Sequence, residues 1–447
     1  MKRAFLIGLL LSSNYLMAQQ LPSVSTPRPH TMQPGISKNY PSNPTIPGVS
    51  FQNNRQSVPQ QTYHPGEVNA RNQAVMRSIE EDIAYFKKME RDRITLSHLI
   101  YKGFPSWKDS PGTEYFFNAY GELDAMLRDS MPLNLERAIF LVENAFLGNS
   151  MEYSDFQETI NQKVKYCQWR MSDLKLDPND GLAKNMVIYS LLTDTLQIKE
   201  PGTEKMITHY PLKYNLDDHD SHQEYTSHFI STLLRTNVGQ CYSMPLVYLI
   251  MAERLGAEAY LALAPSHSLV KIKDDKGAWF NLELTTRAIL SDYHYMNSSY
   301  IKSEAIRNKL YLNALTTKQT VALLFTTLGR YYQDKYGYDP FIWDCADQTL
   351  KYLPNSVDAR IMESNYQTRL TLEIARLIGA HNPEELKKAS PDAYKHYQHM
   401  IRLYKELDDS GYEEMPKEIY ERWLRYVSRL KADELKESQP ALRKVTH

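Results

Sequence analysis

The sequence predicts an α+β fold in which a small core with an antiparallel sheet lies between two helical regions. On both sides of the centre, apolar residues recur at spacings of three and four, the period of an amphipathic helix. One such set is Met76, Ile79, Ile83, Phe86 and Met89. Between about residues 227 and 290 this period gives way to short runs rich in strand-forming residues. The two changes predict a helical prelude at 67–224, a core at 225–300 and a helical region at 301–435.

The two ends of the chain have a different character. Residues 1–18 combine a basic start, a short apolar run and small residues, the pattern of a secretory signal peptide. Residues 19–66 are dense in Pro, Ser, Gln and Asn, and such a segment buries too little apolar surface to offset its ordering entropy. We therefore expect an exported protein, periplasmic or secreted, with a disordered tether at 19–66 and a flexible tail at 436–447.

Composition restricts the partners of the chain. The formal net charge is −1, so no overall field attracts nucleic acid or an anionic membrane. The apolar run in the signal peptide is too short to span a bilayer, and no comparable run recurs. We expect no nucleic-acid partner, and no integral membrane segment once the signal is removed.

The cysteine content is sparse for an exported chain. There are three cysteines, Cys167, Cys241 and Cys345. An odd count leaves at least one free thiol, and a disulfide between Cys167 and Cys345 stays an open alternative.

The core has a recognisable order of elements. A helix ends near Arg235, a turn runs from Asn237 to Gly239, and a second helix begins at about Cys241. Gly256 ends this helix as a C-terminal cap. The expected strands are 260–264, 268–273 and 279–284, and a turn at 274–277 joins the last two as an antiparallel hairpin. In the prelude, helices are expected at 135–142, 155–166 and 184–196.

The helical tail carries a loose repeat signature. The landmarks are Leu328, Gly329, Tyr332, Ala346 and Pro354. With one inserted residue they follow the pattern of a 34-residue tetratricopeptide unit, whose concave arrays commonly bind peptides. An irregular helical bundle is the alternative, and it also accounts for the many tyrosines as packing residues.

Cys241 lies where a thiol becomes reactive. Pro245 breaks a helix interior but is tolerated in the first turn, so the second core helix begins close to Cys241. The positive end of a helix dipole favours a thiolate over a thiol and can hold a developing oxyanion. Cys241 is therefore the candidate nucleophile.

A thiolate nucleophile needs a base and a group that orients it. His267, at the start of a strand, lies 26 residues after Cys241 and is the candidate base. Glu283 lies near the far end of the partner strand. A hairpin loop of even length puts Leu284 opposite His267 and Glu283 on the wrong face, whereas an odd loop or a bulge at Gly277 brings Glu283 to the same face.

Four segments carry a resemblance to a known family. They are Gly239-Gln240-Cys241, Ala252-Glu253-Arg254-Leu255-Gly256, His267-Ser268-Leu269-Val270 and Trp279-Phe280-Asn281-Leu282-Glu283. Over about residues 225–290 the chain resembles the bacterial transglutaminase-like superfamily with the papain fold. Members of its bacterial branch often join a helical prelude and a tetratricopeptide-like tail to the core.

The resemblance implies a catalytic triad. By position, Cys241 is the nucleophile, His267 the base and Glu283 the acid, where the family usually has Asp. Asn281 is an alternative orienting residue because an amide can also hold an imidazole, and Asn281 or Gln240 can assist as orienting or oxyanion groups. The implied function is hydrolysis of a peptide or amide bond in a peptide or protein substrate, through an acyl-thioester and without a cofactor. The alternative is a non-catalytic scaffold that binds a protein partner through the helical tail.

A second cluster of polar residues precedes the core. It comprises Asp217, Asp218, His219, Asp220, His222 and His228. Their spacing matches no standard ligand pattern for a divalent cation, so a solvated loop is the favoured interpretation and no metal is expected.

Overall fold

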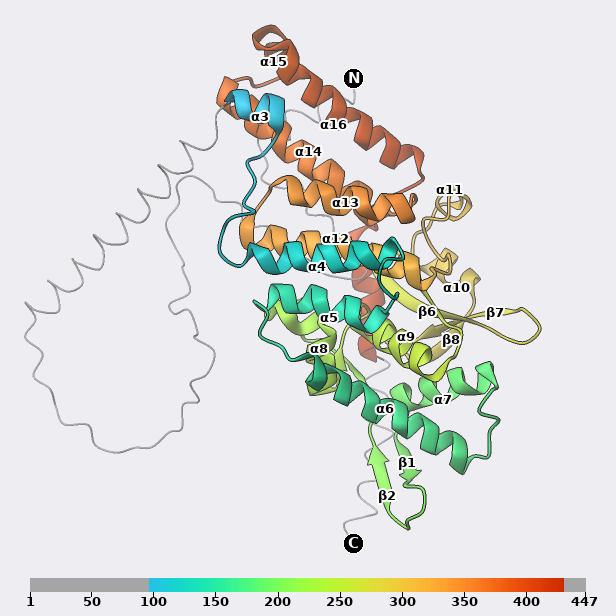
Figure 1. Cartoon of the computed structure of the whole chain (residues 1–447). Helices are drawn as coiled ribbons and strands as arrows, with labels where there is room; N and C mark the ends of the chain where they lie inside the picture. Colours follow the sequence, from blue (N-terminus) through green and yellow to red (C-terminus); the bar gives the residue numbers. More distant parts are fainter. Residues whose placement is uncertain (1–95, 430–447) are drawn as a thin grey trace, which may run out of the picture.

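The computed structural model describes residues 96–429 (Figure 1). The expected signal peptide, the tether at 19–66, the first helix of the prelude and the tail at 436–447 lie outside the described residues. The described chain is a mixed α+β structure, as the sequence predicts. Within 96–429, none of the helices is both long and apolar enough to cross a membrane.

Helices make up most of the first half of the described chain. The elements in order are α3 (Leu96–Lys102), α4 (Thr113–Leu127), α5 (Leu135–Phe146), α6 (Tyr153–Asp173), α7 (Gly181–Thr193), β1 (Leu196–Lys199), β2 (Met206–His209), β3 (Lys213–Tyr214), the 3₁₀ helix η1 (Tyr225–His228), α8 (Ile230–Thr236) and β4 (Val238–Gly239).

The second half contains the main sheet and the long helices of the tail. The elements are α9 (Ser243–Leu255), β5 (Tyr260–Ala264), β6 (His267–Lys273), β7 (Trp279–Glu283), β8 (Ala288–Leu290), α10 (Asp292–Ser298), α11 (Ser303–Arg307), α12 (Thr317–Tyr336), α13 (Pro340–Tyr352), α14 (Val357–Ile378), α15 (Pro383–Ala389) and α16 (Pro391–Asp409). A further helical stretch occupies 417–429.

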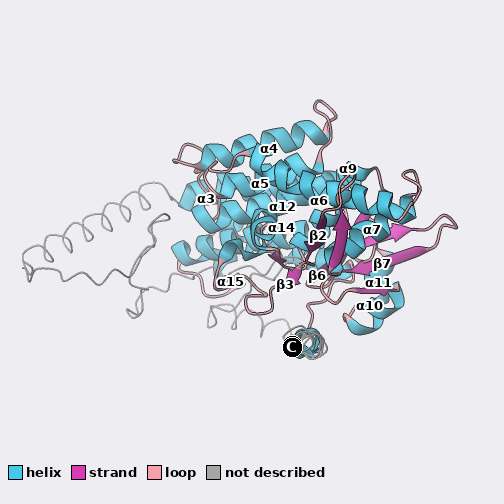
Figure 2. Ribbon diagram, turned by 90° about the horizontal axis from the view of Figure 1, so that it is seen from below, coloured by secondary structure: helices cyan, strands magenta, loops and turns pink. Residues whose placement is uncertain are grey.

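The main sheet has four antiparallel strands in the order β5-β6-β7-β8. The expected hairpin of β6 and β7 is present, with Lys273 paired to Trp279. Helix α9 packs on β5 and β6, and α7 packs on α9. Gly256 adopts a left-handed conformation at the C-terminus of α9, as its position in the sequence predicts. In Figure 2 the strands β6 and β7 lie beside α10 and α11 at one side of the helices.

The prelude is not wholly helical. The helix expected at 184–196 ends at Thr193, because Asp194 is already extended, and β1 then pairs with β2. The sequence also gave no indication of the short parallel pair of β3 and β4, in which Tyr214 lies opposite Gly239. Strands β3 and β4 have two residues each, which is too short to show a hydrophobic alternation that could identify them.

Prelude and tail helices form one continuous helical layer. Helices α4 and α5 pack on α12, and α3 packs on α14 and α16, as Figure 1 shows. The three regions therefore do not pack in the order of the sequence, because tail helices cover the apolar faces of prelude helices.

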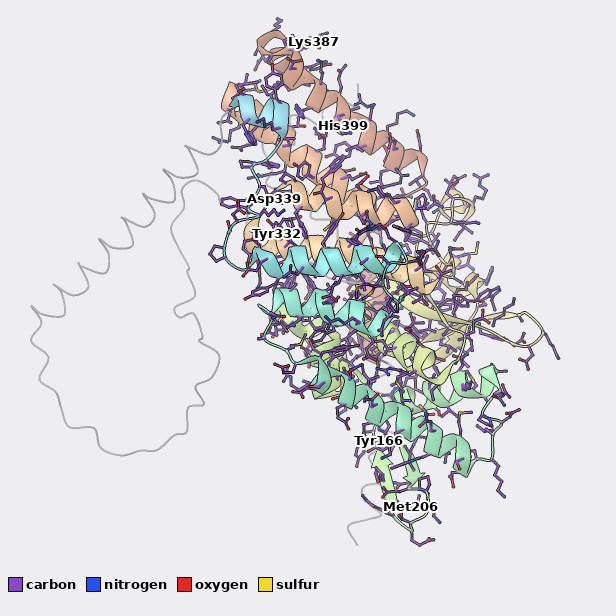
Figure 3. All side chains as sticks on the ribbon, viewed as in Figure 1. Tyr166, Met206, Tyr332, Asp339, Lys387 and His399 are labelled. Carbon is purple, nitrogen blue, oxygen red and sulfur yellow. The ribbon has the colours of Figure 1, made fainter. Side chains whose placement is uncertain are left out.

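The tyrosines of α12 contribute to this layer as packing residues. Tyr331 and Tyr332 are fully buried. The Tyr332 hydroxyl donates to Oδ2 of Asp339 at 2.8 Å, and Oδ1 of Asp339 accepts from the Phe341 N–H at the start of α13 (Figure 3). One carboxylate thus joins the end of α12 to the beginning of α13.

Gly329 marks the closest approach of α12 to its neighbours. A Cβ atom at this position would lie 3.0 Å from Cβ of Cys345 and 3.1 Å from Sδ of Met362. We expect Gly329→Ala to lower the free energy of unfolding by about 1–3 kcal/mol, because overpacking outweighs the better helix propensity of alanine. Denaturant unfolding measures the change.

Gly121 in α4 is the matched control. Its added Cβ would meet nothing within 4 Å, so Gly121→Ala should raise the free energy of unfolding by up to about 1 kcal/mol. An equal increase in the free energy of unfolding for both variants would show that α12 does not pack tightly against α13 and α14 at Gly329.

Candidate functional site

Cys241 lies in a turn between β4 and α9. Helix α9 begins at Ser243, two residues later than the sequence suggested, and Pro245 is its third residue. The turn is tight, because a Cβ on Gly239 would lie 2.3 Å from Cδ1 of Leu233. Cys241 therefore stands just before the first turn of α9, close to backbone N–H groups that have no intrahelical partner.

His267 is positioned by a two-residue turn between β5 and β6. Ala264 pairs with His267, and Ser266 in the turn has a positive φ of 53°. The next residue, Ser268, donates its hydroxyl to the Cys241 carbonyl at 2.6 Å. Strand β6 is thereby fastened directly to the turn that carries the cysteine.

The hairpin register brings Glu283 to the face of His267. The five residues between Lys273 and Trp279 form an odd loop, and Lys271 pairs with Asn281. Odd-numbered residues of β6 and β7 consequently share one face. Nε2 of His267 lies 2.6 Å from Oε2 of Glu283. The loop between β6 and β7 therefore has the odd length that Glu283 needs in order to face His267.

Both oxygens of Glu283 are fully used. Oε1 accepts from the N–H of Thr285 at 3.0 Å and from its hydroxyl at 2.6 Å. Oε2 accepts from the hydroxyl of Tyr295 at 2.9 Å in addition to His267. With 3 % of its surface exposed, Glu283 is a buried carboxylate whose hydrogen bonds fix its position.

Electrostatics favour the charged forms of both partners. Burial alone would lower the pKa of His267, but the Glu283 carboxylate and the nearby Cys241 thiol raise it to about 10. Burial would raise the pKa of Glu283, but the imidazolium and the bonds from Thr285 hold it down at about 2. The site therefore contains an imidazolium–carboxylate pair at neutral pH.

One nitrogen of His267 remains available. Nε2 is occupied by Glu283, whereas Nδ1 is buried and has no hydrogen-bond partner within residues 96–429. Cys241 contributes to the raised pKa of His267, and its carbonyl is held at 2.6 Å by the hydroxyl of Ser268, the residue after His267. Nδ1 is the atom that can exchange a proton with the sulfur of Cys241 or with a reacting group.

Gln240 and Asn281 serve other contacts. Nε2 of Gln240 donates to the Asp218 carbonyl at 2.6 Å and to Oγ of Ser221 at 2.9 Å, so both of its hydrogens are taken and its amide is not an oxyanion donor. Nδ2 of Asn281 donates to Oδ1 of Asp292. Between the two orienting candidates, Glu283 and not Asn281 contacts His267.

The acidic and histidine-rich segment before the core is also engaged structurally. The Asp218 carboxylate accepts from the N–H groups of Gln223 and Glu224 and from Oγ of Ser227. His228 lies between Oγ of Ser221 and the hydroxyl of Tyr331. In the described part of the chain, no three His, Cys, Asp or Glu side chains gather in a group that could hold a metal ion.

The cysteines are free thiols. Cys167 and Cys345 are fully buried and do not form the disulfide that the sequence left open. They lie on α6 and α13, and both belong to the apolar core. Burial raises the pKa of both thiols, which makes them poor nucleophiles.

The helix at 417–429 covers the site. The Trp423 ring lies 5.3 Å from the His267 ring and 6.1 Å from the Tyr214 ring, centroid to centroid. Burial raises the pKa of Tyr420, and the neighbouring Cys241 adds to the effect. Only 8 % of Cys241 is exposed under this cover.

Comparisons with known proteins identify no relative: no family model, no curated protein and no solved structure matches the chain.

Sequence reasoning missed four residues of the site. Thr285 stands two residues after Glu283, a spacing at which a hydroxyl commonly reaches a preceding carboxylate, so it could have been found. Tyr295, Tyr420 and Trp423 reach the site from later elements through tertiary packing, and no local spacing indicates them.

The buried pair makes stability depend on pH. The raised pKa of His267 contributes stability that is complete below about 6.5 and is lost as pH rises toward 10. The lowered pKa of Glu283 contributes stability that is complete above about 4.5 and is lost as pH falls toward 2. Glu283→Gln should therefore destabilise most between pH 4.5 and 6.5, by about 3 kcal/mol.

Unfolding curves of the wild type and Glu283→Gln between pH 3 and 10 measure this difference. Glu204→Gln is the control, because its carboxylate is 94 % exposed in a surface ion pair with Lys199. A penalty for Glu283→Gln that stays constant from pH 3 to 10 would contradict a charged buried pair.

The aromatic cover predicts a steric effect on the thiol. Trp423→Ala should raise the rate at which iodoacetamide alkylates Cys241 by about tenfold, since removing the ring opens a path to the sulfur. Glu418→Ala is the control on the same helix, because Glu418 is exposed and does not line the cavity at His267. Equal rates in both variants would show that the ring of Trp423 does not limit access.

Proposed function

We propose that this chain is an exported cysteine hydrolase with a papain-like, transglutaminase-like core, and that it cleaves an amide or peptide bond through an acyl-thioester at Cys241. The observation that carries the proposal is the buried contact of 2.6 Å between His267 and Glu283, with the thiol of Cys241 beside the same imidazole. Such a nucleophile, base and orienting acid form the recurring arrangement for acyl transfer.

The layout of the elements also supports a papain-like core. The nucleophile precedes a buried helix, α9, and this helix packs on an antiparallel sheet. The base and the acid come from neighbouring strands of that sheet, β6 and β7. A helix start, two adjacent strands and a hydrogen-bonded orienter are the minimal framework that fixes three reacting groups.

The chemistry follows from the protonation of the site. The Cys241 thiolate attacks the carbonyl carbon, and the negative oxygen that develops lies near the N–H groups at the start of α9. The His267 imidazolium gives its proton to the leaving nitrogen as the C–N bond breaks. Water then attacks the thioester, the neutral imidazole takes a proton from this water, and the acid and thiolate separate.

Glu283 acts through the imidazole. It binds Nε2, so Nδ1 faces the chemistry, and it stabilises the positive charge that the ring carries. The hydrogen bonds from Thr285 and Tyr295 keep the carboxylate in place while the ring changes its charge.

Alkylation tests the proposal without knowledge of the substrate. Iodoacetamide at neutral pH should modify Cys241 much faster than free cysteine, and His267→Ala should slow this reaction by about 100-fold because the imidazolium that stabilises the thiolate is lost. Cys241→Ser should abolish amidase activity with the fold intact. Mass spectrometry of the labelled peptides assigns the site.

Glu283→Gln should slow the alkylation of Cys241 less than His267→Ala does. Asn281→Ala should slow it least, because Asn281 contacts Asp292 and not the ring. Cys167→Ser serves as the thiol control because this residue is fully buried. An ordinary alkylation rate for Cys241, unchanged in His267→Ala, would refute the hydrolase and favour an interaction scaffold that binds a protein partner through the helical tail.

A further inference from the structure

A cavity of about 520 Å³ opens beside the imidazole. Its walls come from the turn before β6, from β7 and β8, from α10 and from the helix at 417–429. This volume lies within the range of small-molecule sites. Tyr420, Trp423 and Tyr426 give it apolar walls on the side of the helix.

Positive charge lines the cavity on the side of the helix at 417–429. Arg422, Arg425 and Arg429 line it, and their spacing of three and four places them on one face of the helix. Among the lining residues within 96–429, Glu283 is the only acid, and its two oxygens are already hydrogen-bonded. Arg425 lies 3.6 Å from Glu421, whereas Arg422 and Arg429 have no carboxylate partner among the described residues.

The cavity lies on one side of the reacting pair. His267 is part of its lining, but Cys241 is not. In acyl transfer the imidazolium protonates the leaving nitrogen, so the leaving half of the substrate lies toward the imidazole and the acyl half toward the sulfur. The cavity therefore adjoins the place of the leaving amine.

We propose that this cavity binds the leaving-group half of a peptide substrate that ends in a free carboxylate, and that Arg422 and Arg429 bind this carboxylate. The inference rests on the proposed hydrolase function, and it narrows the substrate to peptides cleaved near their C-terminus. Guanidinium groups match a carboxylate with two parallel hydrogen bonds, and the aromatic walls accommodate the side chain of the released residue.

Charged and neutral alkylating agents test the arginines directly. Iodoacetate and iodoacetamide react with the thiolate in the same way, since the sulfur forms the C–S bond and iodide leaves. The rate of alkylation of Cys241 by iodoacetate, divided by the rate with iodoacetamide, should fall about tenfold in the double variant Arg422→Gln/Arg429→Gln. The reason is that the carboxylate of iodoacetate loses its charged partners. Lys417→Gln is the control on the same helix, because Lys417 does not line the cavity.

The two reagents distinguish a failure of the carboxylate site from a failure of the proposed hydrolase function. Fast alkylation by iodoacetamide with an unchanged ratio in the double variant would overturn the carboxylate site and leave the hydrolase intact. Slow alkylation by iodoacetamide in the wild type would count against the hydrolase itself.

Binding to Cys241→Ser provides a measurement that needs no reactive thiol. By calorimetry, L-alanyl-L-alanine should bind, its C-terminal amide should bind at least about tenfold more weakly, and Arg422→Gln/Arg429→Gln should remove this difference. Inorganic phosphate is the third probe. If phosphate binds as tightly as the dipeptide and depends on the same arginines, the cavity is a general anion site and the inference is wrong.

Discussion

The contact of His267 with Glu283 is the constraint on which the centre of the structure depends. Removing two charges from water costs several kcal/mol for each ion, and only close geometry with further hydrogen bonds offsets that cost. Thr285 and Tyr295 supply those hydrogen bonds to Glu283. The odd loop between β6 and β7 and the position of α10 against the sheet are therefore requirements of the pair.

The helical tail supports the cysteine through a chain of buried hydrogen bonds. Tyr331 of α12 contacts His228, His228 contacts Ser221, and Ser221 accepts from Gln240, the residue before Cys241. Burial lowers the pKa of His228 to about 3, so this chain contains a neutral imidazole and differs in charge from the reactive one. A tail helix, α12, is thus connected through buried hydrogen bonds to the residue that precedes Cys241.

Local patterns could predict part of this arrangement. Pro245 and Gly256 delimit the helix after Cys241, and the strand-forming runs around the turn at 274–277 identify the hairpin. The face of Glu283 could not be predicted, because one residue more or less in the loop reverses it. The position of Trp423 was also beyond prediction, since it depends on the packing of a helix more than 150 residues after His267 in the chain.

The cover formed by 417–429 has two opposite consequences for the site. By excluding water, the aromatic rings strengthen the attraction between His267 and Glu283, because the effective dielectric constant falls. The same rings leave Cys241 only 8 % exposed, so under the proposed hydrolase function a substrate has to displace them to reach the sulfur. Among the described residues, Trp423 contacts the site through the rings of His267 and Tyr214. Ring contacts separate without leaving buried polar groups unpaired, so the pair can remain intact when the cover opens.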